Sequence, residues 1–281
     1  MAVTTRFAPS PTGRLHLGHG WSALLAHDFA RSRAGRFLLR IEDIDGTRSR
    51  EEHVAGIIED LSWLGLAWDG PVMRQSQRMP AYADALERLK AMRLLYPCFC
   101  TRAEIAREIA ASAVAPHHVE PVYPGTCRIL DAAERTARLG QEAHAWRIDM
   151  GKAVAHAGPI AADPLAHGDV VLARKDAPVS YHLAVTVDDA AQGISDVVRG
   201  RDLSAVTDIH RLLQVLLGLP TPHYHHHVLL TGADGRRLAK RDGARSLAEL
   251  RAGGADPEEI VAALRSVASG AQPPEALYRF T

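Results

Sequence analysis

Two histidines, His16 and His19, lie three residues apart at the start of a predicted helix, directly after a predicted strand and a turn rich in proline. At helical spacing both rings lie on one face of the first turn. That turn carries unpaired N–H groups and the positive end of the helix dipole, so it favours a phosphate group. The rings could donate hydrogen bonds to a phosphate whose charge grows during a reaction, and Gly18 leaves room for a flat base against the backbone. An ordinary turn with two surface histidines would contain the same residues.

A basic segment from Arg236 to Gly243 follows the last predicted strand. Lys240, on a mobile loop, could reach over a triphosphate and neutralise the pyrophosphate that leaves. Taken alone, the segment is equally a charged surface loop. Together with the histidine pair it indicates chemistry on a nucleotide.

The chain has three cysteines, Cys98, Cys100 and Cys127. Three is a small and odd number, so a disulfide framework is not expected. In a reduced compartment such a group indicates a metal site or buried thiols rather than a disulfide. Zinc takes four ligands, and by chemistry alone a histidine would be the preferred fourth. The candidates between the cysteines are His117, His118, Glu120 and Tyr123.

Length and composition restrict the class of protein. The 281 residues predict about two domains. Lys plus Arg and Asp plus Glu both number 33, which excludes a bulk polycation that grips nucleic acid. With 47% hydrophobic residues, the chain is also not disordered as a whole. Because it has no apolar run of about 20 residues and no signal sequence, we expect a cytoplasmic protein without a membrane span.

An α/β unit must position the histidine pair. Residues 3–8 predict a strand, residues 17–34 a helix that stops at Gly35, and residues 36–41 a second strand. A strand, a helix and a strand in so short a stretch predict two parallel strands joined by a right-handed crossover. Two amphipathic helices are expected next, near residues 50–65 and 80–95.

Residues 97–165 contain all three cysteines and six prolines, so they are interpreted as an inserted subdomain. Strand patterns return from Gly168, and the tail from Gly270 is predicted to be loose. The later elements predicted are strands at 169–173, 179–187 and 225–230, and helices at 203–218, 246–252 and 257–268.

Several segments together resemble one family. His16 to His19 resembles the "HIGH" signature of class I aminoacyl-tRNA synthetases, and Arg237 to Arg241 resembles their "KMSKS" loop, although Arg237 and Ala239 replace its first lysine and its serine. Four flanking segments, in the same order and spacing, resemble the catalytic domains of glutamyl-tRNA synthetases. These are Arg6 to Gly13, Arg40 to Asp45, Tyr181 to Asp189, and Val198 to Leu203.

The resemblance implies an α/β fold: a Rossmann-type domain with a parallel sheet, an inserted α/β subdomain that carries zinc, and a short C-terminal helical region. The expected segments are 1–96 and 166–230 for the two halves of the catalytic domain, 97–165 for the insertion, and 231–281 for the basic loop and the final helices. About 40 residues follow Arg241, too few for an anticodon-binding domain.

Without that domain, the chain resembles the truncated paralogues of glutamyl-tRNA synthetase that modify tRNA(Asp). Their reaction joins ATP and L-glutamate to glutamyl-adenylate and then transfers the glutamyl group to queuosine in the anticodon arm. The implied partners are therefore ATP with Mg²⁺, L-glutamate and tRNA(Asp) bearing queuosine, and we expect a monomer.

The resemblance also assigns roles to residues. It gives catalysis to His16, His19 and Lys240. It places ATP at His16, Gly18, His19, Arg237, Leu238 and Lys240. It places glutamate at Arg6, Phe7, Ala8, Pro9, Ser10, Glu42, Tyr181 and Arg199. Glu42 would bind the α-ammonium group of glutamate, and the two arginines would bind its two carboxylates. The sequence leaves open which arginine binds which carboxylate. It makes Cys98, Cys100, Tyr123 and Cys127 the ligands of one structural zinc ion.

Two alternative functions keep most of these residues. A glutamate-activating enzyme could charge a tRNA 3′ end or another acceptor with the same active site. A non-catalytic tRNA-binding paralogue would have lost catalytic positions, but Glu42, Arg199 and Lys240 are intact. The histidine run from His223 to His227 is interpreted as a strand end rather than a metal site, because alternate side chains point to opposite faces.

Overall fold

The computed structural model describes residues 2–111, 122–231 and 245–280. The chain divides into two compact units. The first unit consists of Met1–Gln77, Gly193–Ser204 and Pro222–Thr281, and the second of Arg78–Gln192 and Ala205–Thr221. The division into four segments that the sequence suggests stays a prediction.

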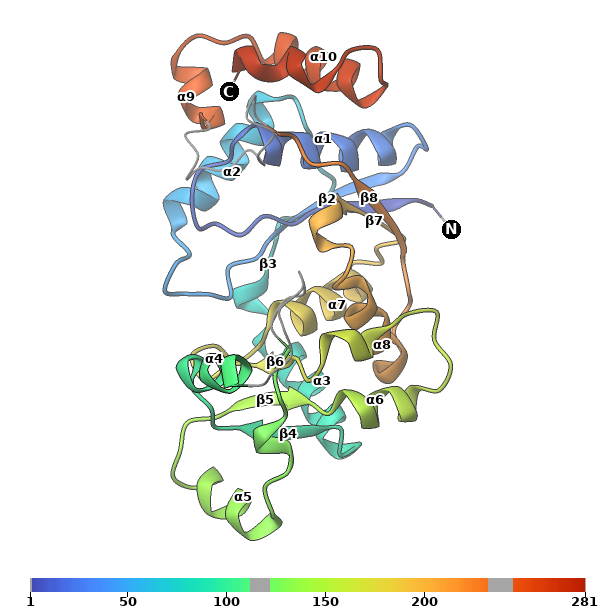
Figure 1. The fold of residues 1–281 in the computed structure, drawn as a ribbon. Helices are drawn as coiled ribbons and strands as arrows, with labels where there is room; N and C mark the ends of the chain where they lie inside the picture. Colours follow the sequence, from blue (N-terminus) through green and yellow to red (C-terminus); the bar gives the residue numbers. More distant parts are fainter. Residues whose placement is uncertain (1, 112–121, 232–244, 281) are drawn as a thin grey trace. The chain divides into compact units, whose positions relative to one another are not determined.

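A parallel sheet organises the first unit (Figure 1). β1 (Thr4–Phe7) pairs with β2 (Arg36–Ile41), and β2 pairs with the short β3 (Met73–Arg74). α1 (Leu17–Arg31) connects β1 to β2, so the predicted parallel strand–helix–strand arrangement is confirmed. α2 (Glu51–Trp63) forms where the first amphipathic helix was expected.

A second parallel pair of strands belongs to the same unit. β7 (Asp196–Gly200) pairs with β8 (His223–His227) along its whole length. The N–H of Ser195 donates to the carbonyl of Thr4 at 3.0 Å, which places the start of β7 beside β1. The predicted strand at 225–230 therefore lay too far toward the C-terminus. β8 ends at His227, which pairs with Gly200, the last residue of β7.

The C-terminal helices complete the core of this unit. α9 (Leu247–Ala252) and α10 (Pro257–Ala268) confirm two predicted helices, and α10 lies along α1 in Figure 1. The prediction of a loose tail was wrong. Leu277 and Phe280, in the 3₁₀ helix Pro274–Phe280, are 2% and 7% exposed and pack in the same apolar cluster as α1. Burial of two large apolar side chains outweighs the glycine and proline signals that precede them.

An ion pair between Asp28 of α1 and Arg265 of α10 has an O–N distance of 2.8 Å. Partial burial opposes ionisation of Asp28, but hydrogen bonds from His27 and Arg265 lower the pKa of its carboxyl to about 2. A carboxyl whose pKa is lower in the native state stabilises the fold above its unfolded value of about 3.9 and loses that contribution as the pH falls toward 2.

Asp28→Asn is therefore expected to lower the free energy of unfolding at pH 7, by less than about 1 kcal/mol because both side chains are partly exposed. The difference from the parent protein should shrink between pH 4 and pH 2. Urea unfolding at pH 7 and pH 2.5 measures it, with Arg265→Ala as a second variant that should follow the same trend. An equal loss of stability at both pH values would contradict the assignment.

The second unit contains the antiparallel sheet β4 (Leu95–Cys98), β5 (Ala145–Ile148) and β6 (Val171–Ala173). The helix predicted at 80–95 ends at Ala91, because Arg93 adopts a left-handed conformation (φ 58°) that turns the chain into β4. Its helices are α3 (Met79–Ala91), α4 (Arg102–Ala111), α5 (Ala132–Leu139), α6 (Met150–Ala157), α7 (Tyr181–Ala191) and α8 (Thr207–Leu217).

The predicted strand at 179–187 was wrong, since residues 181–187 form the first part of α7. The β-branched residues Val185, Thr186 and Val187 favour a strand locally. The helix forms instead because Asp188, fully buried on α7, accepts hydrogen bonds from Tyr82 and Arg78 of the second unit. Helix α8 begins at Thr207, later than predicted, and ends as predicted at Gly218, which has a φ of 62°.

Candidate active site and metal centre

The turn after β1 is built around the histidine pair. His16 is the N-cap of α1, and its Nδ1 accepts the N–H of Gly18 at 3.1 Å. The N–H of His16 donates in turn to Nδ1 of His19 at 3.2 Å. The two rings lie 3.9 Å apart between centroids. They thus make a reciprocal capping box, a role that serine or threonine with glutamate usually fills.

This capping fixes the tautomer of both rings. Because each Nδ1 accepts a backbone N–H, each neutral ring carries its proton on Nε2. An Nε2–H group is a hydrogen-bond donor, which is the role that the sequence predicted for phosphate recognition. His16 is 8% exposed and His19 is half-buried, so the rings are held by the fold rather than displayed on a loose turn.

Ser246 lies directly beside the histidine turn. It forms an antiparallel bridge with His16, and the N–H of Leu247 donates to the carbonyl of Leu15 at 2.9 Å. The described chain resumes at Arg245, so the residues that follow the basic segment are attached to the turn that carries His16. Sequence analysis missed this contact, which no local pattern predicts. The predicted ATP-binding residues of the segment, Arg237, Leu238 and Lys240, lie outside the described residues.

Glu42, the predicted ammonium ligand, follows β2 directly, as expected. Its N–H donates to the carbonyl of Pro9 at 3.0 Å, which joins the end of β2 to the turn after β1. Its side chain is 9% exposed, and its Oε1 lies 3.4 Å from Nη2 of the fully buried Arg40. The sequence marks Arg40 only as part of a segment that resembles the family, and its ion pair with Glu42 is a contact that the sequence does not predict.

The two predicted carboxylate ligands are buried arginines of the first unit. Arg6 on β1 is 4% exposed and Arg199 on β7 is 5% exposed. Each lies close to the C-terminal end of its strand, where ligands of parallel sheets bind. Arg199 donates to the carbonyl of Leu203 at 3.0 Å, and its guanidinium lies 5.1 Å from the centre of the Tyr224 ring.

The other predicted glutamate residues differ in their surroundings. The side chain of Phe7 is buried in the apolar core, Pro9 is buried, Ala8 is half-buried and Ser10 is exposed. Tyr181 belongs to the second unit, where it is the first residue of α7 rather than a strand residue as predicted. Its ring lies 5.6 Å from that of His210.

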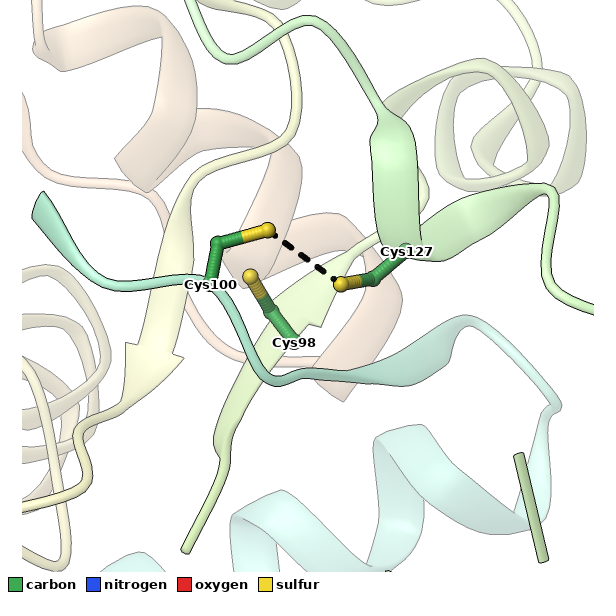
Figure 2. A group of neighbouring side chains, drawn as sticks. All are labelled: Cys98, Cys100 and Cys127. Carbon is green, nitrogen blue, oxygen red and sulfur yellow. Dashed lines mark hydrogen bonds between the residues drawn. The ribbon is translucent and has the colours of Figure 1, made fainter. Parts of the chain in front are cut away.

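The three cysteines converge in the second unit (Figure 2). Their Sγ atoms all lie within 4.8 Å of one another, and those of Cys100 and Cys127 are 3.4 Å apart. Cys98 ends β4, and Cys127 lies in the 3₁₀ helix Thr126–Arg128, so two distant segments contribute to one cluster. All three thiols are free. In a zinc tetrahedron with bonds of ~2.3 Å, sulfur atoms lie about 3.8 Å apart, so the cluster has the dimensions of such a site.

Tyr123 brings an oxygen atom to this cluster. Its Oη lies 3.5 Å from Sγ of Cys100 and accepts the N–H of Cys127 at 2.9 Å. Burial raises the pKa of the Cys100 thiol to about 12 and also raises that of the Tyr123 hydroxyl. Burial opposes ionisation of Cys127 too, but hydrogen bonds from Tyr123 and from the N–H of Phe99 lower its pKa.

Three sulfur atoms and one phenolic oxygen facing one another make a donor set that suits zinc. Binding would require a cation to displace the protons of the donors, so zinc affinity should fall at low pH. The other ligand candidates from the sequence, His117, His118 and Glu120, lie outside the described residues. Within the described residues, only these cysteines form a group of three or more typical metal ligands.

The histidines of β8 have separate partners. Nε2 of His225 lies 2.9 Å from Asp196 on β7, and Nδ1 of His227 lies 2.8 Å from the carbonyl of Val228. Burial lowers the pKa of His227. The contact of His225 attaches β8 to β7. No helix in the described part of the chain is long and apolar enough to cross a membrane.

Comparison with known proteins identifies the family. Residues 2–277 match the catalytic domain of class I tRNA synthetases for E and Q. The chain belongs to this family. It is 50% identical to a glutamyl-Q tRNA(Asp) synthetase of Rhodobacter capsulatus, over 92% of this chain and 98% of that protein. It is 46% identical to a protein of the same name from Symbiobacterium thermophilum, over 96% of this chain and 88% of that protein.

Solved structures agree with this family. A glutamate–tRNA synthetase from Elizabethkingia anophelis superimposes with a TM-score of 0.72 at 29% identity, covering 86% of this chain. The match covers 53% of that structure, so the chain spans about half the length of the synthetase. These comparisons confirm the predicted family, its ligase class and its Rossmann-like parallel sheet.

Proposed function

We propose that this class I synthetase activates L-glutamate with ATP and transfers the glutamyl group to queuosine at the wobble position of tRNA(Asp). The observation that carries the proposal is the identity of 50% over 98% of a relative that bears the name glutamyl-Q tRNA(Asp) synthetase. The geometry of the first unit supports it, because the segment between β1 and α1 holds two Nε2–H donors and accepts the N–H of Glu42 at the carbonyl of Pro9.

In the activation step, an oxygen of the glutamate α-carboxylate attacks the α-phosphorus of ATP. The bond between that phosphorus and the bridging oxygen breaks, and pyrophosphate leaves. The carboxylate is already a nucleophile, so positioning and charge neutralisation carry the step. His16 and His19 would donate from Nε2 to phosphate oxygens, and Lys240 would neutralise the leaving pyrophosphate. Mg²⁺ bound with ATP would screen the phosphate charge.

The glutamate pocket would combine an anion for the ammonium with cations for the carboxylates. Glu42, held by Arg40 and by the carbonyl of Pro9, suits the α-ammonium. Arg6 and Arg199 suit carboxylates, because a buried guanidinium offers two parallel N–H donors. Ser10, with the backbone from Phe7 to Pro9, would complete the part of the pocket that the first unit supplies.

In the transfer step, a hydroxyl oxygen of queuosine attacks the carbonyl carbon of glutamyl-adenylate. An ester bond forms, the bond between the carbonyl carbon and the phosphate oxygen breaks, AMP leaves with that oxygen, and the hydroxyl proton is released to solvent. The zinc centre of Cys98, Cys100, Tyr123 and Cys127 would have no part in either step. It would be structural and would join β4 to the segment around Cys127.

The deciding experiment is transfer of radiolabelled glutamate, with ATP, to tRNA(Asp) that carries queuosine and to tRNA(Asp) that carries guanosine at the same position. We expect label on the queuosine form only, released by mild base and retained after the 3′-terminal adenosine is removed. A Glu42→Gln variant should lose the label. Label on the 3′-terminal adenosine, or formation of glutamyl-adenylate without transfer to either tRNA, would overturn the proposed acceptor.

A further inference from the structure

A buried arginine covers the aromatic ring whose oxygen faces the cysteine cluster. Arg147 lies on β5 and is 9% exposed. Its guanidinium carbon lies 3.9 Å from the centre of the Tyr123 ring, within the range of a cation–π contact. Within the described residues, its buried Nε has no hydrogen-bond partner. The ring of Tyr123 is therefore a principal contact of this charge.

Asp169 fixes the position of Arg147. Nη1 of Arg147 donates to the backbone carbonyl of Asp169 at 2.6 Å. The Asp169 carboxylate, 3% exposed, accepts hydrogen bonds from Tyr96 at 2.6 Å and from the N–H of Met150 at 2.9 Å. The same carboxylate accepts Nη1 of Arg128 at 2.8 Å, and Arg128 directly follows Cys127. One buried aspartate thus anchors the arginine over Tyr123 and the arginine next to Cys127.

We propose that Arg147 is a positioning residue of the metal centre, acting on zinc through Tyr123. Three thiolates and a phenolate carry four negative charges against the two positive charges of zinc, so the bound centre would have a net charge of −2. A guanidinium over the ring offsets the charge of the phenolate and holds the tyrosine oxygen against the sulfur atoms. Outer partners of this kind typically change metal affinity 10–100-fold when they are replaced. The inference rests on the proposed zinc centre.

The test is zinc affinity of the full chain, measured by competition with a chromophoric chelator. Arg147→Met, which keeps the length and apolar stem of the side chain, should weaken zinc binding by about 10–100-fold. Tyr123→Phe should weaken it as well. Because Arg147 acts through the tyrosine oxygen, the double variant should bind zinc about as tightly as Tyr123→Phe alone.

A matched control is available on the same strand. The ammonium of Lys90 lies 4.1 Å from the centre of the Trp146 ring, but Trp146 offers no ligand atom. Lys90→Met should leave zinc affinity unchanged. Far-UV circular dichroism of each variant establishes that it is folded.

The outcomes separate the two proposals. If the parent chain binds no zinc, the metal centre itself is wrong. If it binds zinc and Arg147→Met binds it equally well, only the role of Arg147 is overturned. A loss of the same size in the parent and in the Tyr123→Phe background also overturns it, since that result indicates a general structural effect.

Discussion

Replacing Arg199 by alanine is expected to raise the KM for glutamate by about 10²- to 10³-fold while the KM for ATP changes little. Arg199 is 5% exposed, so a carboxylate bound beside it is removed from water and depends on the guanidinium for compensation. Truncating one partner of such a buried charge pair costs about 2–5 kcal/mol, and each ~1.4 kcal/mol is a factor of ten in affinity. ATP–pyrophosphate exchange at varied glutamate concentration measures the effect.

An arginine of the same unit provides the control. The guanidinium of Arg33 also lies over an aromatic ring, 3.8 Å from the centre of Phe29, but the side chain is exposed at the end of α1. Arg33→Ala should leave exchange unchanged. If Arg199→Ala exchanges normally at low glutamate and melts like the parent protein, Arg199 is not a glutamate ligand.

Local signals explain which parts of the fold the sequence predicted. β1, α1 and β2 were found because Gly35 separates the helix from the second strand and because the apolar residues of α1 repeat at helical spacing. α7 was mistaken for a strand because its β-branched residues favour one, whereas the buried contacts of Asp188 that support the helix come from distant residues. The prediction of a loose C-terminal tail failed for a related reason, since Leu277 and Phe280 become ordered only by packing on the core.

The candidate site shows the same limit. His16, Glu42 and the cysteines were found because short motifs mark them. Their supports could not be found this way, because each is a contact between residues far apart in sequence. Ser246 reaches the histidine turn, and Arg147 reaches Tyr123, only in the folded chain. Motifs identify the residues that would touch the substrate or the metal, whereas tertiary structure identifies the residues that hold them.

Cys127→Ser is expected to abolish stoichiometric zinc binding and to lower the melting temperature in zinc-containing buffer. Cys127 is 2% exposed, and its Sγ atom lies within 4.8 Å of the sulfur atoms of two other cysteines. A solvent-exposed side chain could therefore replace it as a zinc ligand only if the chain around the cluster moved. A metal that binds only the native state adds its binding free energy to the stability of the fold, and loss of a ligand removes that contribution. Zinc content by atomic absorption and thermal melting measure both effects.

Two comparisons make this result specific to the metal. The parent protein treated with a strong chelator should melt close to the temperature of Cys127→Ser, and the chelator should shift the variant little, because neither then holds zinc. Ile129→Ser changes a side chain that is 82% exposed and only two residues away, so it should keep full zinc content. Cys127→Ser with a full complement of zinc, or parent protein purified without chelator and free of zinc, would show that the three thiols are merely buried. The expected pattern, in which chelator and variant have the same effect, would show that the segment around Cys127 is held to β4 by the metal rather than by the packing of its thiols.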